Sequence, residues 1–225
     1  AHGDGRALIE LHATPGTRPA PAGATLGLYH FAILLPGRAS LGRFLAHLAA
    51  RDERAGMSDH LVSEALYLAD PDGLGIEVYA DRPRSGWRHD GRELEMATEP
   101  LDARGVIAAG GGEPWTGMPP GTVIGHVHLH VGASLRRKPF ITRVWDSIRR
   151  CGVTRARCSL ARVALTIISA RTPGREGTLP AADQARLLSW DLVMPGSEDA
   201  ESAAKSLADA GHAVRDEGGG WAAAD

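Results

Sequence analysis

A short apolar segment that contains histidine recurs along this chain, and this repetition constrains the fold more than any other feature. GLYHFAILLP begins at Gly27, IGHVHLHVG begins at Ile124, and a third strand-like segment, LLSWDLVMP, begins at Leu187. The third segment is followed by a helical pattern, DAESAAKSLADAGHAV. Repetition of one supersecondary unit predicts an architecture built from similar modules.

The segment after Gly27 shows what one module contains. Ser40 is placed to cap a helix in SLGRFLAHLAARDER, whose apolar positions have helical spacing: Leu41, Phe44, Leu45 and Leu48. A weak strand is expected near 56–62, and two stronger strands flank the turn DPDGLG. The order is β-α-β-β-β. The predicted fold class is therefore α+β, with repeated βαβββ modules and curved mixed sheets.

The module pattern divides the chain. The strand-like ALIELHA near the start and the Pro/Gly-rich segment after it suggest the last strand of a truncated first module, followed by a linker. A short helix is expected near Leu101–Ala109. The expected divisions are a first-module remnant (1–12), a second module (27–84), a connector (85–120), a third module (121–180) and a partial fourth module (184–225).

Residues 133–178 depart from the rest of the chain in composition. This segment holds eleven of the 25 basic residues, two of the 27 acidic residues and both cysteines. Its basic residues follow no helical or strand period. A frameshift is the preferred hypothesis, because GVTRARCSLARVA and LTIISARTP are compatible with codons that read as plausible sheet sequence two nucleotides along. A nucleic-acid-binding insert is the alternative.

Bulk properties restrict the partners. The formal net charge is −2, so no nucleic-acid partner is expected. No apolar run reaches the roughly 18 residues of a membrane span, so no membrane partner is expected either. Two cysteines suggest no disulfide framework, and no signal peptide is evident. The expectation is a cytoplasmic protein that acts on a small molecule, with a homo-oligomer left open.

The three histidines of IGHVHLHVG alternate with Val127, Leu129 and Val131. Successive side chains of a strand point to opposite faces, so His126, His128 and His130 share one face. That face either contributes to a metal site or is exposed to water, and the strand alone does not decide between them.

The chain resembles the catechol 2,3-dioxygenase-like branch of the vicinal-oxygen-chelate superfamily, which also contains glyoxalase and bleomycin-resistance proteins. The resemblance rests on GLYHFAILLP, SDHLVSEALYLADPDGLGIEVYADRPRSGW, MATEPLD and GTVIGHVHLHVG. It implies sheets of paired βαβββ modules that form a metal-binding cup. It also implies Fe(II), or alternatively Mn(II) or another divalent metal, with a small aromatic diol and O2 as substrates of extradiol ring cleavage. Two histidines and one carboxylate suit such a metal and leave positions open for substrates.

The resemblance also implies roles for particular residues. The expected metal ligands are His30, Glu77 and His126, the last only if the second and third modules pair. The expected catalytic residues are His60, as an acid–base group, and Tyr67. The expected substrate-binding residues are His128, His130 and Arg82, although a surface ion pair is the simpler reading of Arg82.

Other functions fit the same scaffold, since fold does not determine function. A glyoxalase-like isomerase or a lyase would favour a second carboxylate ligand and Zn or Ni. A metal-free protein of this fold could bind a small molecule without catalysis. A truncated, frameshifted chain could be inactive.

Overall fold

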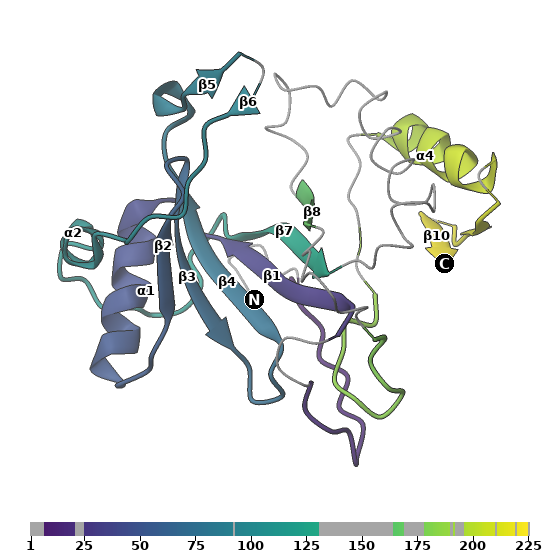
Figure 1. Ribbon diagram of the computed structural model, residues 1–225, viewed down its shortest axis with the longest axis horizontal. Coiled ribbons are helices and arrows are strands. Elements are labelled where there is room, and N and C mark those ends of the chain that lie inside the picture. The colour runs from purple at the N-terminus through teal and green to yellow at the C-terminus, as the bar shows by residue number, and fades with distance from the viewer. Residues whose placement is uncertain are drawn as a thin grey trace.

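The computed structural model describes residues 7–20, 25–91, 93–130, 164–168, 178–189, 191, 196–209, 211–218 and 220–224. A six-stranded mixed sheet in the order β2-β3-β4-β1-β7-β8 is its main feature (Figure 1). Its strands are β1 (Gly27–Leu34), β2 (Gly56–Asp59), β3 (Ser63–Ala69), β4 (Gly75–Asp81), β7 (Val123–His130) and β8 (Ala164–Ile168). The α+β class is confirmed, and residues 27–81 contain a complete βαβββ unit.

Helices lie beside the strands. They are α1 (Arg38–Ala50), the 3₁₀ turn η1 (Arg84–Gly86), α2 (Ala103–Ala109) and α4 (Ser197–Asp209). Two short hairpins complete the described elements: β5 (His89–Asp90) with β6 (Glu93–Leu94), and β9 (Ala213–Asp216) with β10 (Trp221–Ala224). No helix of the described ranges is long and apolar enough to cross a membrane.

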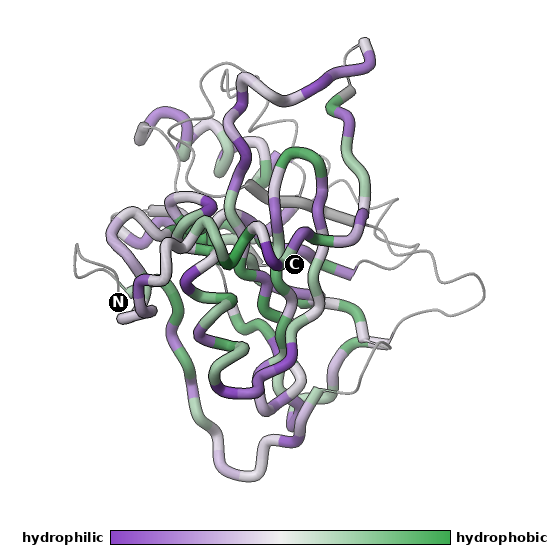
Figure 2. The backbone as a smooth tube through the Cα atoms, turned by 90° about the vertical axis from the view of Figure 1, so that its left-hand side faces the viewer, coloured by the Kyte–Doolittle hydropathy of each residue, from purple (hydrophilic) through white to green (hydrophobic). Residues whose placement is uncertain are grey.

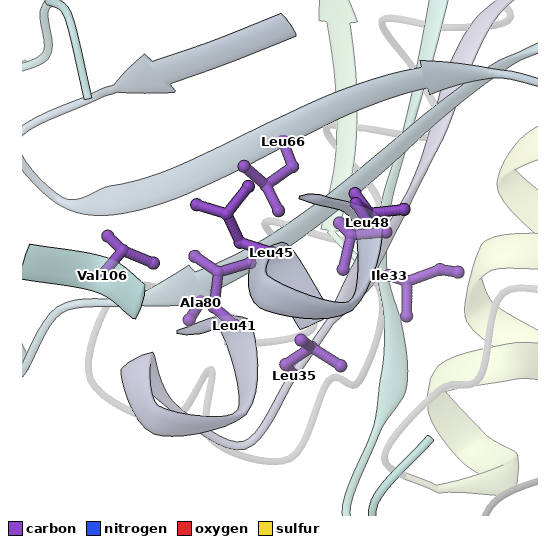
Figure 3. Packing of buried hydrophobic residues seen from close by; sticks show 9 residues of the cluster. Ile33, Leu35, Leu41, Leu45, Leu48, Leu66, Ala80 and Val106 are labelled. Atoms are coloured by element: carbon purple, nitrogen blue, oxygen red, sulfur yellow. The ribbon is translucent and has the colours of Figure 1, made fainter. Parts of the chain in front are cut away.

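One face of the sheet packs against α1. Leu41, Leu45 and Leu48 of the helix are buried in one cluster with Leu66 and Ala80 of the sheet (Figure 3). Hydrophobic and hydrophilic positions alternate around this helix, as its amphipathic sequence requires (Figure 2). Burying a Leu side chain stabilises the fold by about 1.5–3 kcal/mol. This core leaves the other face of β1, β4 and β7 available for polar residues.

The expected cap of α1 is wrong by three residues. The helix begins at Arg38 after Gly37, and no side chain caps it. Ser40 lies within the first turn and is buried. Asp102, which the sequence pattern did not single out, does cap α2 by accepting a hydrogen bond from the Gly105 N–H at 3.0 Å.

The ends of the chain agree less well with the expectations. Residues 7–13 form no strand, because they have no β-partner in the part of the chain that the structure describes, and Leu11 is 89% exposed there. Residues 187–189 are also not in a strand, and most of the remaining LLSWDLVMP segment lies outside the described residues. The anomalous segment 133–178, with its frameshift hypothesis, lies outside them as well, apart from β8 and Thr178.

Candidate metal centre

Three potential metal ligands converge on the face of the sheet opposite α1. His30 comes from β1, Glu77 from β4 and His126 from β7, and their ligand atoms lie within 4.8 Å of one another. The Glu77 Oε2 atom is 2.8 Å from His30 Nε2 and 3.1 Å from His126 Nε2. His30 and Glu77 are buried, and His126 is nearly so. The structure thus brings together all three residues expected as ligands.

Strand pairing explains this convergence. β1 pairs in parallel with β4, which sets Ala32 beside Glu77, and antiparallel with β7, which sets Ala32 beside His126. Alternate residues share a face, so His30 points to the same side as these neighbours. β1 and β7 are the first strands of the segments expected to be the second and third modules, and the expectation for His126 depended on their pairing.

The pairing of β1 with β7 contains two β-bulges, one next to His30 and one next to His126. Tyr29 has no register partner in β7, and Gly125 has none in β1. Each bulged residue immediately precedes a histidine of the cluster, and Phe31 pairs with Val127 midway between the two bulges. His30 and His126 are therefore related by an approximate two-fold axis through that pair. Bulges near sites redirect side chains, and here the two occur at equivalent places in the two strands.

The charge of Glu77 is stabilised where it lies. Burial acts to raise the pKa of its carboxyl, but hydrogen bonds and charges of His126 and His30 outweigh burial and lower the pKa to about 2. Glu77 is consequently an anion at neutral pH. An anionic carboxylate between two imidazoles can bind a divalent cation without a proton first leaving the oxygen.

His128 and His130 extend the same face of β7. The Nδ1 atom of His128 is 3.2 Å from His30 Nε2, and burial together with neighbouring histidines lowers the pKa of His128 to about 4. His128 is therefore neutral at pH 7. His130 stacks on Tyr29, with ring centroids 4.6 Å apart. Tyr29, which sequence reasoning missed, reaches these rings from the bulge and is 48% exposed.

His60 and Tyr67 form a hydrogen-bonded pair beside the cluster. His60 Nε2 lies 2.8 Å from the Tyr67 hydroxyl, and His60 Nδ1 lies 2.7 Å from the carbonyl oxygen of Ala97. A carbonyl only accepts, so Nδ1 carries a proton, and in the neutral imidazole Nε2 accepts from the Tyr67 hydroxyl. The Tyr67 ring is 5.6 Å from that of His30. Burial, reinforced by the charge of Glu77, raises the pKa of Tyr67, so its hydroxyl stays protonated.

Arg82 does not join the cluster. Its guanidinium forms ion pairs with Asp59 and Glu64, and Glu64 also binds Arg38 of α1. These contacts lie on the helix-covered side of the sheet, because β4 alternates and Arg82 follows the core residues Val78 and Ala80. The structure therefore separates Arg82 from the other residues expected to bind substrate.

Tyr79 packs beside His126 and close to Gly125. The Tyr79 ring centroid is 5.2 Å from that of His126. A Cβ atom at position 125 would lie 2.0 Å from the Tyr79 hydroxyl oxygen, so any larger residue there would have to displace the Tyr79 ring. An isolated glycine within a strand indicates a bulge or a close backbone approach, and Gly125 in IGHVHLHVG carried that signal.

Gly125→Ala is expected to weaken metal binding at the cluster and to lower the free energy of unfolding by about 1–3 kcal/mol. The added methyl group displaces Tyr79, which packs on His126. Adding Tyr79→Phe removes the closest atom and is expected to restore part of both losses. Urea unfolding of the two variants and of Tyr79→Phe alone checks this, and full additivity of the two changes would contradict it.

The donor set fits a divalent transition metal. Two imidazole nitrogens and one carboxylate oxygen on one side suit non-haem Fe(II) and leave coordination positions for other ligands. The position on β8 that corresponds to Glu77 through the two-fold relation is Thr166, which pairs with His128. No second carboxylate therefore occupies the equivalent register position on β8.

The chain is 49% identical over 141 residues to a protein of Bacillus subtilis (strain 168) named catechol-2,3-dioxygenase. This chain is thus similar to a protein named as a dioxygenase. The matched part is 62% of this chain and 49% of that protein, so the chain spans about half the length of its relative. No protein-family model and no solved structure matches the chain. Independently of this similarity, the His–His–Glu cluster could hold a metal ion.

Proposed function

We propose that this chain contributes the Fe(II) centre of an extradiol ring-cleaving dioxygenase that acts on a catechol-type aromatic with O2. The observation that supports the proposal most directly is the convergence of His30, Glu77 and His126 on one face. In this proposal the three side chains hold the metal through two Nε2 atoms and one carboxylate oxygen. Bound Fe(II) would supply the redox chemistry that joins dioxygen to the ring. Mn(II) is the alternative metal.

His60 is the proposed acid–base group. Its Nε2 atom is an acceptor, held towards the cluster side by the hydrogen bonds at both ring nitrogens. It can therefore take a proton from a catechol hydroxyl and return it to product later. Tyr67 is proposed to donate its hydroxyl hydrogen to the substrate oxygen when His60 is protonated, because its raised pKa keeps it a donor.

His128 and His130 are proposed to contact the substrate ring. The lowered pKa of His128 keeps that imidazole uncharged, which suits contact with an aromatic ring in a partly dry site. Arg82 has no part in substrate contact in this proposal, since Asp59 and Glu64 already engage its guanidinium. A glyoxalase-like isomerase is less well supported, because Thr166 stands at the register position where a second carboxylate would lie.

The test is anaerobic reconstitution of the full chain with Fe(II), followed by oxygen uptake with catechol and detection of the yellow ring-opened product. The proposal expects about one iron per chain and uptake that depends on iron. Iron bound without uptake or product would refute the catalytic part of the proposal. Absence of bound iron would refute the metal site.

His60→Gln is expected to lower kcat by about 10²–10⁴-fold while the iron content stays unchanged, since proton transfer by a positioned side chain contributes that much. His47→Gln on α1 is a matched control, because His47 lies in the last turn of the helix, on an element that contributes no ligand to the cluster. Metal analysis and initial rates check the prediction. Equal kcat in His60→Gln and the wild type would contradict a proton-transfer role.

A further inference from the structure

Every residue of the turn that carries His60 takes part in a hydrogen bond. The turn runs from Asp59 to Val62 between β2 and β3 and contains Leu61 at a φ of 67°, a left-handed conformation that a branched apolar residue rarely adopts. The Asp59 side chain accepts a hydrogen bond from the Leu61 N–H at 2.9 Å. The His60 N–H donates to the Ser63 carbonyl at 2.8 Å. Surrounding contacts must therefore stabilise this shape.

The same turn also holds the segment 97–99, which lies against the His60 ring. Asp59 and Glu99 exchange two backbone hydrogen bonds of 2.9 Å each. Ala97, two residues before Glu99, supplies the carbonyl that accepts from His60 Nδ1. The carbonyl that faces His60 Nδ1 is therefore linked to Asp59 through residues 97–99.

Arg82 fixes Asp59 from the far side of the sheet. Its backbone N–H donates to the Val62 carbonyl at 2.8 Å, at the other end of the turn. Its Nη2 atom pairs with the Asp59 carboxylate and lies 3.2 Å from Glu64 Oε1. Glu64 is 1% exposed and is also bound by the Arg38 Nε at 2.7 Å. Arg82 thus links a buried, doubly paired carboxylate to the turn.

We propose that Arg82 is a positioning residue that acts through Asp59 to hold His60 in its Nδ1-protonated form, with Nε2 facing Tyr67. The consequence for catalysis rests on the proposed function, but the positioning itself does not need it. Arg82 then serves the site without touching substrate. The geometry accounts for a charge network around the buried Glu64 carboxylate on the face of the sheet opposite the cluster, next to the turn that bears His60.

The test uses the metal-free full chain labelled with ¹⁵N-histidine. Long-range ¹H–¹⁵N spectra distinguish a protonated from an unprotonated ring nitrogen, and the loss of one signal set in His60→Gln assigns His60. The wild type is expected to show a protonated Nδ1 and an unprotonated Nε2. In Arg82→Met the two nitrogen shifts are expected to move towards each other as the Ala97 hydrogen bond loosens.

Two further variants keep this test decisive. Arg38→Met removes the other ion pair of Glu64 without touching Asp59, so it is expected to leave the His60 shifts as in the wild type. Asp59→Asn keeps an oxygen for the Leu61 N–H but loses the ion pair, so it is expected to change them as Arg82→Met does, even if that variant folds poorly. Unchanged His60 shifts in Arg82→Met and Asp59→Asn, or equal changes in Arg38→Met, would overturn the proposal.

Activity gives an independent readout if the wild-type chain turns over catechol. Arg82→Met is expected to lower kcat by about 10-fold, with KM and iron content unchanged, by analogy with the roughly 10–100-fold cost of losing a residue that supports a metal ligand. In a His60→Gln background the same change is expected to lower kcat less than about 2-fold, because both act through one residue. A full 10-fold loss in that background would overturn the proposal. If the wild-type chain does not turn over catechol, the proposed function fails, and the His60 nitrogen shifts still decide whether Arg82 positions His60.

Discussion

Glu77→Gln is expected to reduce the bound divalent metal from about one per chain to a trace. Glutamine keeps the length and volume of the side chain but replaces the anion with a neutral amide. Glu77 is the carboxylate of the described cluster, and its oxygen faces both His30 and His126. Changes to groups that merely support metal ligands cost 10–100-fold in affinity, so loss of the anionic ligand is expected to exceed about 100-fold.

Calorimetric titration of the metal-free chain with Fe(II) or Mn(II) under argon measures this loss of affinity, and metal analysis gives the amount bound. Glu64→Gln is the matched control, because Glu64 is also a buried carboxylate but faces α1 from the neighbouring strand. That variant is expected to lose stability and to keep its metal. Wild-type affinity in Glu77→Gln, with a native circular dichroism spectrum, would show that the metal binds elsewhere.

Elements with strong local patterns could be predicted from the sequence. The spacing of Leu41, Leu45 and Leu48 gave α1, and the two apolar runs around DPDGLG gave β3 and β4. Element ends were less predictable, since Ser40 looks like a cap but Gly37 precedes the helix. The segment 7–13 shows the limit of such patterns, because a strand also needs a partner, and alternation alone does not supply one.

The candidate site depends on long-range register, which local patterns do not contain. Alternation placed three histidines on one face of β7, but it could not tell which of them would meet Glu77. The register between β1 and β7 decides this, because it sets Ala32 beside both Glu77 and His126. A shift of two residues would bring His128 to that place instead. The family resemblance pointed to a ligand on the first strand of a partner module, and so to His126 only on the condition that the second and third modules pair. It also suggested Arg82, whose partners, Asp59 and Glu64, no sequence spacing revealed.

The metal-free chain is expected to lose stability in acid in two stages. His128 has a pKa of about 4 in the folded chain because it is buried, against about 6.5 when unfolded. The unfolded state therefore binds a proton first, and stability falls as pH drops from about 6.5 to 4. Glu77 has a folded pKa of about 2, so its contribution is full above about 4.5 and is lost as pH falls towards 2.

Urea unfolding in EDTA at pH 7.0, 5.5 and 4.5 isolates the first stage. We expect the free energy of unfolding to fall by about 1–3 kcal/mol from His128 over this window, allowing for partial solvent screening. His128→Leu cannot bind the proton, so its stability is expected to depend less on pH there, whereas His47→Leu on α1 keeps the wild-type dependence. The same pH dependence in His128→Leu and the wild type would mean that His128 is protonated as readily in the folded chain as in the unfolded one. The face around the cluster would then be wetter than its burial indicates.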